Sequence, residues 1–496
     1  MTARSLRLRS LSLLVPLLAG AACRSGAPQH AGSTLAFNAC HLTSESAVVV
    51  DAECASLTVP EARSPGHDPK GRTLDLAIAV VRATGRKTAP DPLFFLAGGP
   101  GQSALDAYPG VAGSFARVNL THDIVLVDQR GTGRSGPLAC PETELETTTV
   151  DRAKVVALAE RCRVNLETRA DLRQYTTAIA MDDLDEVRER LGYDKIDLYG
   201  GSYGTRAALV YLRRHGNHVR SVILDGVAPP DWTIGGTLGR DAQRSMDLLF
   251  ARCAADPACN GAFPDLHGSL SSLLDKVTTP QTVTVTHPVS AVPTTLTVSR
   301  ESVGSTLRAL SYESETIALL PLLIHSAAAT GDLHPLAAQS LILSDFMKIS
   351  QGEHLAVVCN EDAPYIDPAQ LEKDNGSTYV GTGPGLLYLE ACKTWPRADV
   401  TPEDRAPVSS NAPVLLLSGE LDPVTPPANA AWAARTLPNS FQVTVPGEGH
   451  NALQRSCTRR IIEDFIERAS VAGLSADCLK DAKPMRFFTS FAGPQP

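Results

Sequence analysis

Ser202 lies in the pentapeptide Gly-Gly-Ser-Tyr-Gly, where glycines flank a hydroxyl group that could act as a nucleophile. A β-rich apolar run, residues 196–199, precedes it, and a run with helical spacing, residues 205–215, follows it. Glycines at these positions permit a tight strand-to-helix turn, which holds the serine exposed at the end of a strand. The pattern predicts a serine nucleophile and acyl-transfer chemistry.

A serine nucleophile needs a general base and an acid that orients this base. Asp422 follows the apolar run 414–417, and His450 lies in a glycine-rich loop after the run 441–445. The chain order serine, acid, histidine is that of an α/β-hydrolase. We therefore expect His450 to take the proton of Ser202 and Asp422 to hold the imidazole in the required tautomer.

Two alternatives concern the acid. The Asp422-Pro423 dipeptide is also typical of a turn, so the aspartate could serve only to initiate that turn. Glu420 lies in the same loop and is the nearest competing carboxylate.

Residues 97–103 form a glycine-rich segment directly after the apolar run 93–96. Because glycines have no side chain, backbone N–H groups there can approach a carbonyl oxygen that gains negative charge. We expect the N–H groups of Gly99 and Tyr203 to form the oxyanion hole. A phosphate-binding loop is the alternative, but the lysine and Ser/Thr pattern of a P-loop is absent.

The elements that must position these groups alternate between strands and helices. Apolar runs predict a mostly parallel sheet with strands at residues 76–81, 93–96, 124–128, 196–199, 221–225, 414–417 and 441–445. Amphipathic spacing predicts helices at residues 175–191 and 459–469. The alternation lapses between residues 229 and 407, where we expect a mainly helical cap with helices at 246–254, 316–329 and 337–347 and a hairpin of 282–286 with 294–298.

Three motifs in this order resemble those of the proline iminopeptidase group of α/β-hydrolases. They are Gly98-Gly99-Pro100-Gly101, Asp128-Gln129-Arg130-Gly131 with Gly133 and Ser135, and the pentapeptide around Ser202. With its large insertion and many cysteines, the chain looks most like the secreted tripeptidyl aminopeptidase branch. The resemblance implies an α/β-hydrolase fold and a serine aminopeptidase that needs no metal or organic cofactor.

Two residues of these motifs qualify the resemblance. Ala97 replaces the histidine that opens the iminopeptidase motif, which argues against strict proline specificity. We expect Asp128 and Arg130 to brace a loop as an ion pair rather than to touch the substrate.

An aminopeptidase of this group must bind a free N-terminal ammonium, and carboxylates from the cap are a physical solution. Glu361 and Asp362 lie near the end of the expected cap, next to Cys359, and are our candidates for this role. The alternative is an acidic surface loop.

The N-terminus has the features of an export signal. Residues 1–22 combine Arg4, Arg7 and Arg9 with an apolar run at 11–18 and small residues at 19–22. The apolar run is shorter than the roughly 20 residues that a membrane span needs. Cys23 follows Gly-Ala-Ala and resembles a bacterial lipobox cysteine, so the mature protein is either lipid-anchored or, after ordinary signal cleavage, a free periplasmic or secreted enzyme.

The chain has 11 cysteines, and removing Cys23 leaves an even number, as disulfides in an exported protein require. Sequence does not fix their connectivity. Pairing of nearest neighbours gives Cys40–Cys54, Cys140–Cys162, Cys253–Cys259, Cys359–Cys392 and Cys457–Cys478.

Chain length and net charge limit the domain organisation and the kinds of partner that the protein can have. The 496 residues suffice for a hydrolase core with an insertion, and a net charge of -9 argues against nucleic acid as a partner. The expected organisation is a signal peptide (1–22), a leader (23–36), the core (37–228 and 408–480), a cap (229–407) and a tail (481–496).

The sequence therefore predicts an exported serine hydrolase acting on peptides with a free N-terminus. A carboxylic-ester hydrolase with the same triad is the alternative. A non-catalytic binding protein on the same scaffold is a third, and the complete set of serine, aspartate and histidine argues against it.

Overall fold

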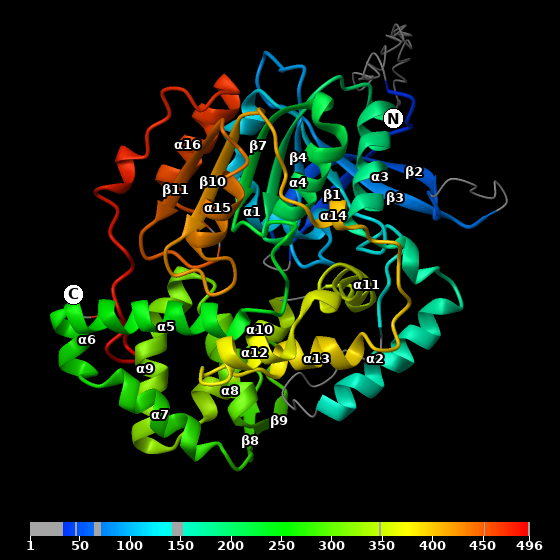
Figure 1. Cartoon of the computed structure of the whole chain (residues 1–496). Coiled ribbons are helices and arrows are strands. Elements are labelled where there is room, and N and C mark those ends of the chain that lie inside the picture. Colours follow the sequence, from blue (N-terminus) through cyan, green and yellow to red (C-terminus); the bar gives the residue numbers. More distant parts are fainter. Residues whose placement is uncertain are drawn as a thin grey trace, which may run out of the picture.

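The computed structural model describes residues 33–44, 47–63, 71–140, 152–346, 349–450 and 452–494. A sheet with flanking helices forms one layer of the molecule, and a mainly helical cap lies against one end of that sheet (Figure 1). The expected signal peptide and Cys23 lie outside the described residues.

The central sheet has the strand order β1-β2-β3-β5-β4-β6-β7-β10-β11. The three pairs β1–β2, β2–β3 and β3–β5 are antiparallel. The remaining pairs, β5–β4, β4–β6, β6–β7, β7–β10 and β10–β11, are parallel. The strands are β1 (Asn38–Thr43), β2 (Val49–Pro60), β3 (Thr73–Val81), β4 (Leu93–Leu96), β5 (Ile124–Val127), β6 (Ile196–Gly201), β7 (Val219–Asp225), β10 (Val414–Gly419) and β11 (Ser440–Val445).

Apolar side chains on both faces of the sheet are covered by helices. One face packs against α3 (Thr177–Leu191), α4 (Tyr203–His215) and α15 (Pro427–Ala434). The other face packs against α1 (Ala104–Phe115) and α16 (Ser456–Arg468). The mostly parallel sheet with helices on both faces confirms the predicted fold class.

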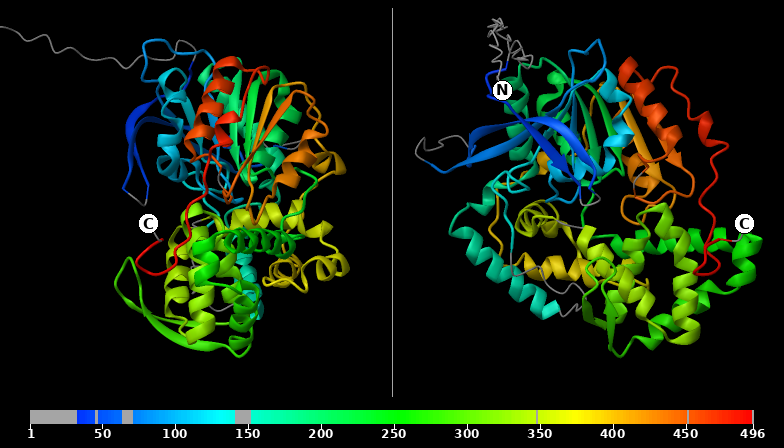
Figure 2. Two further views of the ribbon diagram at one scale, coloured as in Figure 1. Left: turned by 90° about the vertical axis from the view of Figure 1, so that its left-hand side faces the viewer. Right: turned by 180° about the vertical axis from the view of Figure 1, so that it is seen from behind.

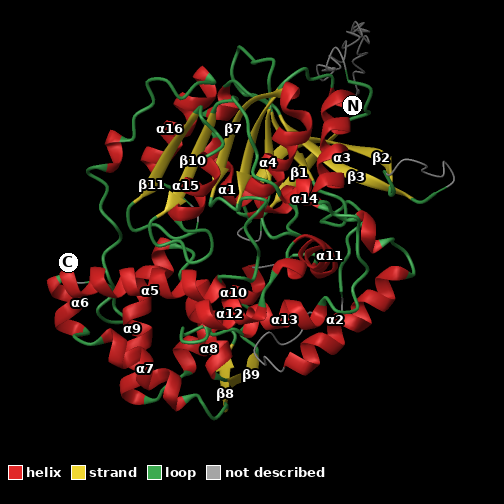
Figure 3. Ribbon diagram, viewed as in Figure 1, coloured by secondary structure: helices red, strands yellow, loops and turns green. Residues whose placement is uncertain are grey.

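The cap has its own apolar core, formed mainly by the helices between β7 and β10 (Figure 3). Its elements are α5 (Leu238–Ala255), α6 (Pro257–Ala262), α7 (Leu266–Lys276), β8 (Gln281–Thr286), β9 (Pro293–Val298), α8 (Arg300–Leu310), α9 (Ser314–Thr330), α10 (His334–Phe346), α11 (Gln351–Glu361), α12 (Pro368–Asn375), α13 (Gly383–Ala391) and α14 (Pro402–Arg405). The predicted hairpin is present as the antiparallel pair of β8 and β9.

Two segments from outside residues 229–407 also belong to this layer. Helix α2 (Arg152–Glu167) lies beside α13, and its Cys162 and Leu166 share a buried cluster with Cys359 and Trp395 (Figure 1). The tail after α16 runs down to the cap, where Phe487 joins the cap core and the Phe488 N–H donates to the Ala318 carbonyl at 3.1 Å. Figure 2 shows this crossing from behind. The expected boundaries placed both segments apart from the cap, and the apolar clusters correct this.

The described cysteines form disulfides between nearest neighbours along the chain. The pairs are Cys40–Cys54, Cys140–Cys162, Cys253–Cys259, Cys359–Cys392 and Cys457–Cys478. Each closes a short loop, of between 6 and 33 residues. In the described part of the chain, no helix has the length and apolar character needed to cross a membrane.

Candidate active site

Ser202 forms a sharp turn between β6 and α4. Its backbone has φ 56° and ψ -123°, a strained conformation for a residue with a side chain. The flanking glycines allow this turn, because a Cβ at Gly200 would lie 2.2 Å from the Gly204 carbonyl and one at Gly204 would lie 2.3 Å from the Leu96 carbonyl. The Ser202 side chain is partly exposed, as an attacking group must be.

His450 and Asp422 meet at the carboxyl ends of the strands. His450 Nδ1 lies 2.9 Å from Asp422 Oδ2, and both side chains are buried, with exposed fractions of 5% and 0%. Asp422 also accepts hydrogen bonds from the backbone N–H groups of Val424 and Thr425 at 2.8 Å. Its carboxylate is therefore held in one orientation toward the imidazole.

Electrostatics at this pair suit a general base. The pKa of Asp422 is lowered because His450 and backbone N–H groups favour its carboxylate over the opposing cost of burial. Burial lowers the pKa of His450, but the charge and hydrogen bond of Asp422 outweigh this and raise it. An imidazolium formed during the reaction is thus stabilised.

Glu420, the competing carboxylate, does not reach His450. It accepts a hydrogen bond from the Gly447 N–H at 2.8 Å instead. The geometry therefore favours Asp422 as the partner of the imidazole.

The glycine-rich loop lies directly beside the serine. A Cβ at Gly98 would lie 3.3 Å from the Ser202 Cβ, and the Gly98 N–H is held by the Gln102 side chain at 3.1 Å. The N–H groups of Gly99 and Tyr203 make no hydrogen bond to any described residue, so both are available to an oxyanion. The described contacts of His450 Nδ1 are to Asp422 and Thr425, and they include no hydrogen bond to the Ser202 hydroxyl.

The cap contacts both sides of this site. Near the oxyanion loop, the Ser350 N–H donates to the Gly101 carbonyl at 2.8 Å, and His354 Nδ1 lies 3.1 Å from the Pro100 carbonyl. On the other side, the Tyr312 carbonyl accepts from the His450 N–H at 2.8 Å and the two rings lie 4.9 Å apart. The cap therefore contacts both the oxyanion loop and the histidine of the triad.

Glu361 and Asp362 do not form the free ammonium site that we expected. Asp362 is fully buried and binds the Arg206 guanidinium through both oxygens, at 2.9 and 3.1 Å. Glu361 accepts from the Thr177 N–H at 2.6 Å and the Thr177 hydroxyl at 2.7 Å. Because their partners come from α3 and α4, both carboxylates join the cap to the core, which corrects the expectation and also excludes a surface loop.

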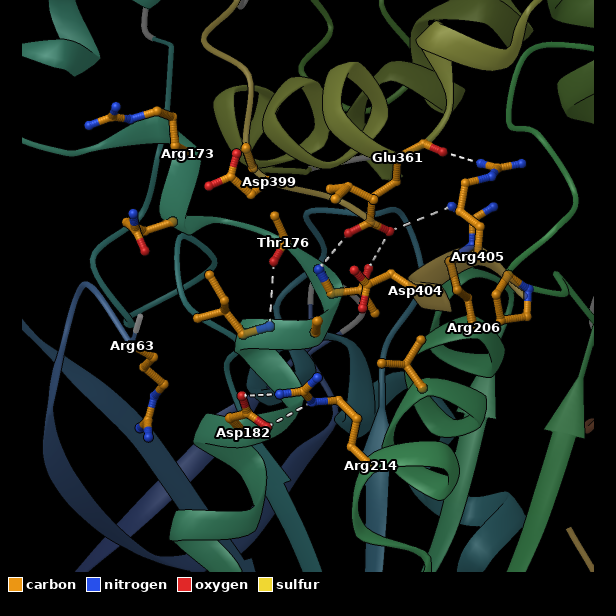
Figure 4. A pocket seen from close by; sticks show the side chains of 18 of the residues that line it. Arg63, Arg173, Thr176, Asp182, Arg206, Arg214, Glu361, Asp399, Asp404 and Arg405 are labelled. Atoms are coloured by element: carbon orange, nitrogen blue, oxygen red, sulfur yellow. Dashed lines mark hydrogen bonds and ion pairs between the residues drawn. The ribbon is translucent and has the colours of Figure 1, made fainter. Parts of the chain in front are cut away.

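A cavity of about 420 Å³ lies behind this junction (Figure 4). The start of α3, the side chains of Arg206 and Arg214, and the segment 397–405 enclose it. Ser202 and His450 are not among its lining residues. In Figure 4 the Glu361 carboxylate points toward Arg206, and together with its hydrogen bonds to Thr177 this fits a bracing role.

Asp128 and Arg130 brace the loop after β5, but not as a pair with each other. Asp128 accepts from the Ser103 hydroxyl at 2.7 Å and the Arg134 N–H at 2.9 Å. Arg130 instead binds both oxygens of Asp183 on α3, at 2.7 and 2.8 Å. The expected ion pair is therefore wrong, because Asp128 binds the start of α1, where it also accepts from the Leu105 N–H at 3.1 Å, whereas Arg130 binds α3.

Two residues that the sequence analysis did not single out touch the triad. The Thr425 hydroxyl lies 2.8 Å from Asp422 Oδ2 and 3.2 Å from His450 Nδ1. Asp225 ends β7, and its carbonyl accepts from the Ser202 N–H at 2.8 Å. Its position at the carboxyl end of a strand beside the nucleophile strand was the available signal, since catalytic groups of open α/β sheets gather there.

A second group of acidic and histidine side chains lies away from this site. Asp185, His215 and His218 are close enough to hold a metal ion. Asp185 already accepts from Arg188 at 2.7 Å and the Tyr211 hydroxyl at 2.7 Å. The cluster is thus a satisfied ion-pair network between α3 and α4.

Comparison with known families agrees with this geometry. The model of the α/β hydrolase fold matches residues 91–255, and that of the TAP-like proteins matches residues 380–478. These matches include the segments of the serine, the aspartate and the histidine. The protein is an α/β-hydrolase and a serine hydrolase.

Several relatives of known kind are similar to this chain. The serine protease Hip1 of Mycobacterium tuberculosis is 24% identical over 86% of this chain and 87% of its own. The tripeptidyl aminopeptidase of Streptomyces coelicolor is 24% identical over 87% of this chain and 84% of its own. Carboxylesterase B of Mycobacterium tuberculosis is 29% identical over 51% of this chain and 53% of its own. The chain is thus similar both to serine peptidases and to a carboxylesterase of the α/β-hydrolase fold.

Proposed function

We propose that this protein is an exported serine aminopeptidase that releases N-terminal residues or tripeptides through an acyl-enzyme on Ser202. The observation that carries the proposal is the hydrogen-bonded pair of His450 and Asp422 beside a strained Ser202 with free backbone donors next to it. The similarity to TAP-like proteins favours peptides with a free N-terminus as substrates.

The residues act in the following order in the proposed reaction. His450 removes the proton of Ser202 as its oxygen attacks the scissile carbonyl carbon, and the N–H groups of Gly99 and Tyr203 bind the resulting oxyanion. The imidazolium, oriented by Asp422, then protonates the leaving amine. Water attacks the acyl-enzyme with His450 again as base, and Ser202 is regenerated.

Export is supported by the disulfides between the described cysteines, because such bonds persist in oxidising compartments. The signal-like residues 1–22 support it independently. Lipid attachment at Cys23 and simple secretion remain the two forms that export could take.

Ester hydrolysis is the second candidate, because the chain is also 29% identical to a carboxylesterase over half its length. The same triad would attack an ester carbonyl. Here the leaving group is an alcohol, which needs less assistance from the imidazolium than an amine does.

A fluorogenic tripeptide amide tested with a free and with an acetylated N-terminus separates the two functions. We expect the wild-type protein to cleave the free peptide at least tenfold better in kcat/KM, while the Ser202→Ala variant cleaves neither and is not labelled by a fluorophosphonate. Equal cleavage of both peptides, or hydrolysis of p-nitrophenyl esters alone, contradicts the aminopeptidase. Undiminished labelling of Ser202→Ala contradicts the nucleophile.

A further inference from the structure

Asp225 is a buried carboxyl group beside the triad that the mechanism above does not use. It ends β7, next to the strand that carries Ser202, and its side chain is 2% exposed. A buried carboxylate costs free energy unless its surroundings compensate for lost hydration. Its contacts therefore indicate what the group does.

Asp225 contacts the segments that hold both Ser202 and His450. Its Oδ2 accepts from the Tyr199 hydroxyl on β6 at 3.0 Å, and its Oδ1 accepts from the Ala452 N–H at 3.3 Å. Its backbone carbonyl holds the Ser202 N–H at 2.8 Å. Ala452 follows the histidine by two positions in the chain, so the side chain of Asp225 holds the backbone shortly after His450.

Gly226, the residue after Asp225, shows how near the His450 imidazole lies to the end of β7. A Cβ at Gly226 would be 3.2 Å from His450 Cε1 and 3.1 Å from Thr425 Oγ1. The chain after Asp225 is thus packed directly against the histidine ring. Glycine at this position leaves room for it.

Several charged and titratable groups face His450. Asp422 after β10 and Asp225 on β7 raise its pKa, and Arg308 on α8 lowers it. The Tyr312 ring of the cap contacts the His450 ring in an edge-to-face arrangement, and burial raises the pKa of Tyr312. Burial also raises the pKa of Asp225 to about 6, while the Tyr199 hydroxyl, the Ala452 N–H and His450 oppose this and Asp422 adds to it.

We propose that Asp225 is a positioning residue of the reaction, which holds the His450 loop through Ala452 and adds a second negative charge that favours the imidazolium. This inference rests on the proposed triad. Asp422 orients the ring by direct contact at Nδ1, whereas Asp225 acts through the backbone of residue 452 and through its field. The two carboxylates approach the histidine from different strands.

The pH profile distinguishes this role from a merely structural one. His450 must be neutral to act as base, so a charge that raises its pKa moves the acid limb of kcat/KM to higher pH. In the nearly isosteric Asp225→Asn variant we expect the limb to move down by about 0.5 to 1 pH unit. The plateau should fall by about 3-fold to 30-fold, because the imidazolium of the transition state loses one partner charge.

Two further variants sharpen the test. Tyr199→Phe keeps the Asp225 carboxyl but removes a hydrogen bond to its ionised form, so the limb should move in the same direction by a smaller amount. Asp197→Asn is the matched control, because Asp197 is also fully buried with a pKa raised by burial to about 6, but is paired with Arg220 and Ser221. Its acid limb should superimpose on that of the wild type.

The substrate is p-nitrophenyl acetate, which a serine hydrolase cleaves whether or not it is an aminopeptidase, with fluorophosphonate labelling used to count active sites. An unlabelled, inactive wild type contradicts the proposed triad itself. A labelled and folded Asp225→Asn variant whose limb stays at the wild-type pH contradicts the role of Asp225 alone. A shift of equal size in Asp197→Asn also contradicts it, because any buried carboxyl would then have the same effect.

Discussion

At the scale of single residues, the triad is held by more contacts than its three members supply. Asp422 makes hydrogen bonds through both oxygens, to two backbone N–H groups, to Thr425 and to His450. A carboxylate with this many donors cannot rotate away from the imidazole without losing several of them. The orientation of His450 is therefore fixed before substrate binds.

Removing the hydroxyl of Thr425 tests this arrangement. The Thr425→Val variant loses a charge-assisted hydrogen bond to Asp422 of roughly 1.5 to 3 kcal/mol, so kcat should fall by about 10-fold to 100-fold with KM little changed. Steady-state kinetics measures both constants. The Thr425→Ser variant keeps the hydroxyl and should retain most activity, and a loss as large as that of the valine variant would show that packing of the methyl group is responsible.

The serine, aspartate and histidine could be singled out from sequence because each follows a strand, in a fixed order. Thr425 could not, since a threonine in a turn is common. Asp225 ends a predicted strand, which places it near the site, but many aspartates end strands and this position alone does not indicate a role. For Glu361 and Asp362, the sequence predicted a functional role that the structure does not support. Their position in the chain suggested a binding site, but their partner Arg206 lies 156 residues away from Asp362, a distance that no local pattern reveals.

At the scale of elements, α11 connects the cap to the core at both of its ends. Its start contacts the oxyanion loop through His354, and its end contacts α3 and α4 through Glu361 and Asp362. The ion pair of Asp362 with Arg206 is nearly inaccessible to water, with exposed fractions of 0% and 1%. Such a pair is costly to break, because one charge is left without a partner.

The Arg206→Met variant breaks this pair while keeping the length of the side chain. We expect the free energy of unfolding to fall by about 3 kcal/mol, the lower end of the range for a broken buried pair, since Asp362 keeps the Ile234 N–H at 2.8 Å and the more distant Arg405 guanidinium at 3.8 Å. Urea denaturation measures this difference. Arg173→Ala, which breaks an exposed pair with Asp171, is the control and should cost less than about 1 kcal/mol. Similar losses in both variants would contradict the anchoring role of Arg206.

Strands buried on both faces were predictable, whereas β1 and β2 were missed. β4 and β5 consist of four buried apolar residues each, which gives a clear signal. β1 is an edge strand with mostly exposed side chains, and only Leu42 is fully buried in it. Its stability comes from pairing with β2, a contact between segments that composition alone does not disclose.

At the scale of the whole molecule, the cap is held by several separate parts of the chain. The tail contributes Phe487, which is 5% exposed and has the Arg252 guanidinium 4.3 Å from its ring centre. The last residues thereby return from α16 to the cap core. Contacts of this kind couple the stability of the two layers.

The Phe487→Ala variant tests how much this return contributes. Loss of a buried phenyl ring should lower the free energy of unfolding by about 3 kcal/mol. Phe491→Ala is the matched control, because that ring is 66% exposed and its removal should change stability by less than about 0.5 kcal/mol. Thermal or urea unfolding of the two variants, compared side by side, decides whether the tail is part of the cap.

The location of α2 and of the tail in the cap layer has a consequence for engineering. A graft that exchanges only residues 229–407 between related enzymes would leave Leu166 of α2 and Phe487 of the tail facing a foreign surface. Chimaeras should therefore transfer residues 137–176 and the end of the chain together with the insertion. The cap layer is therefore assembled from three stretches of the chain, and transferring one contiguous segment does not transfer the whole layer.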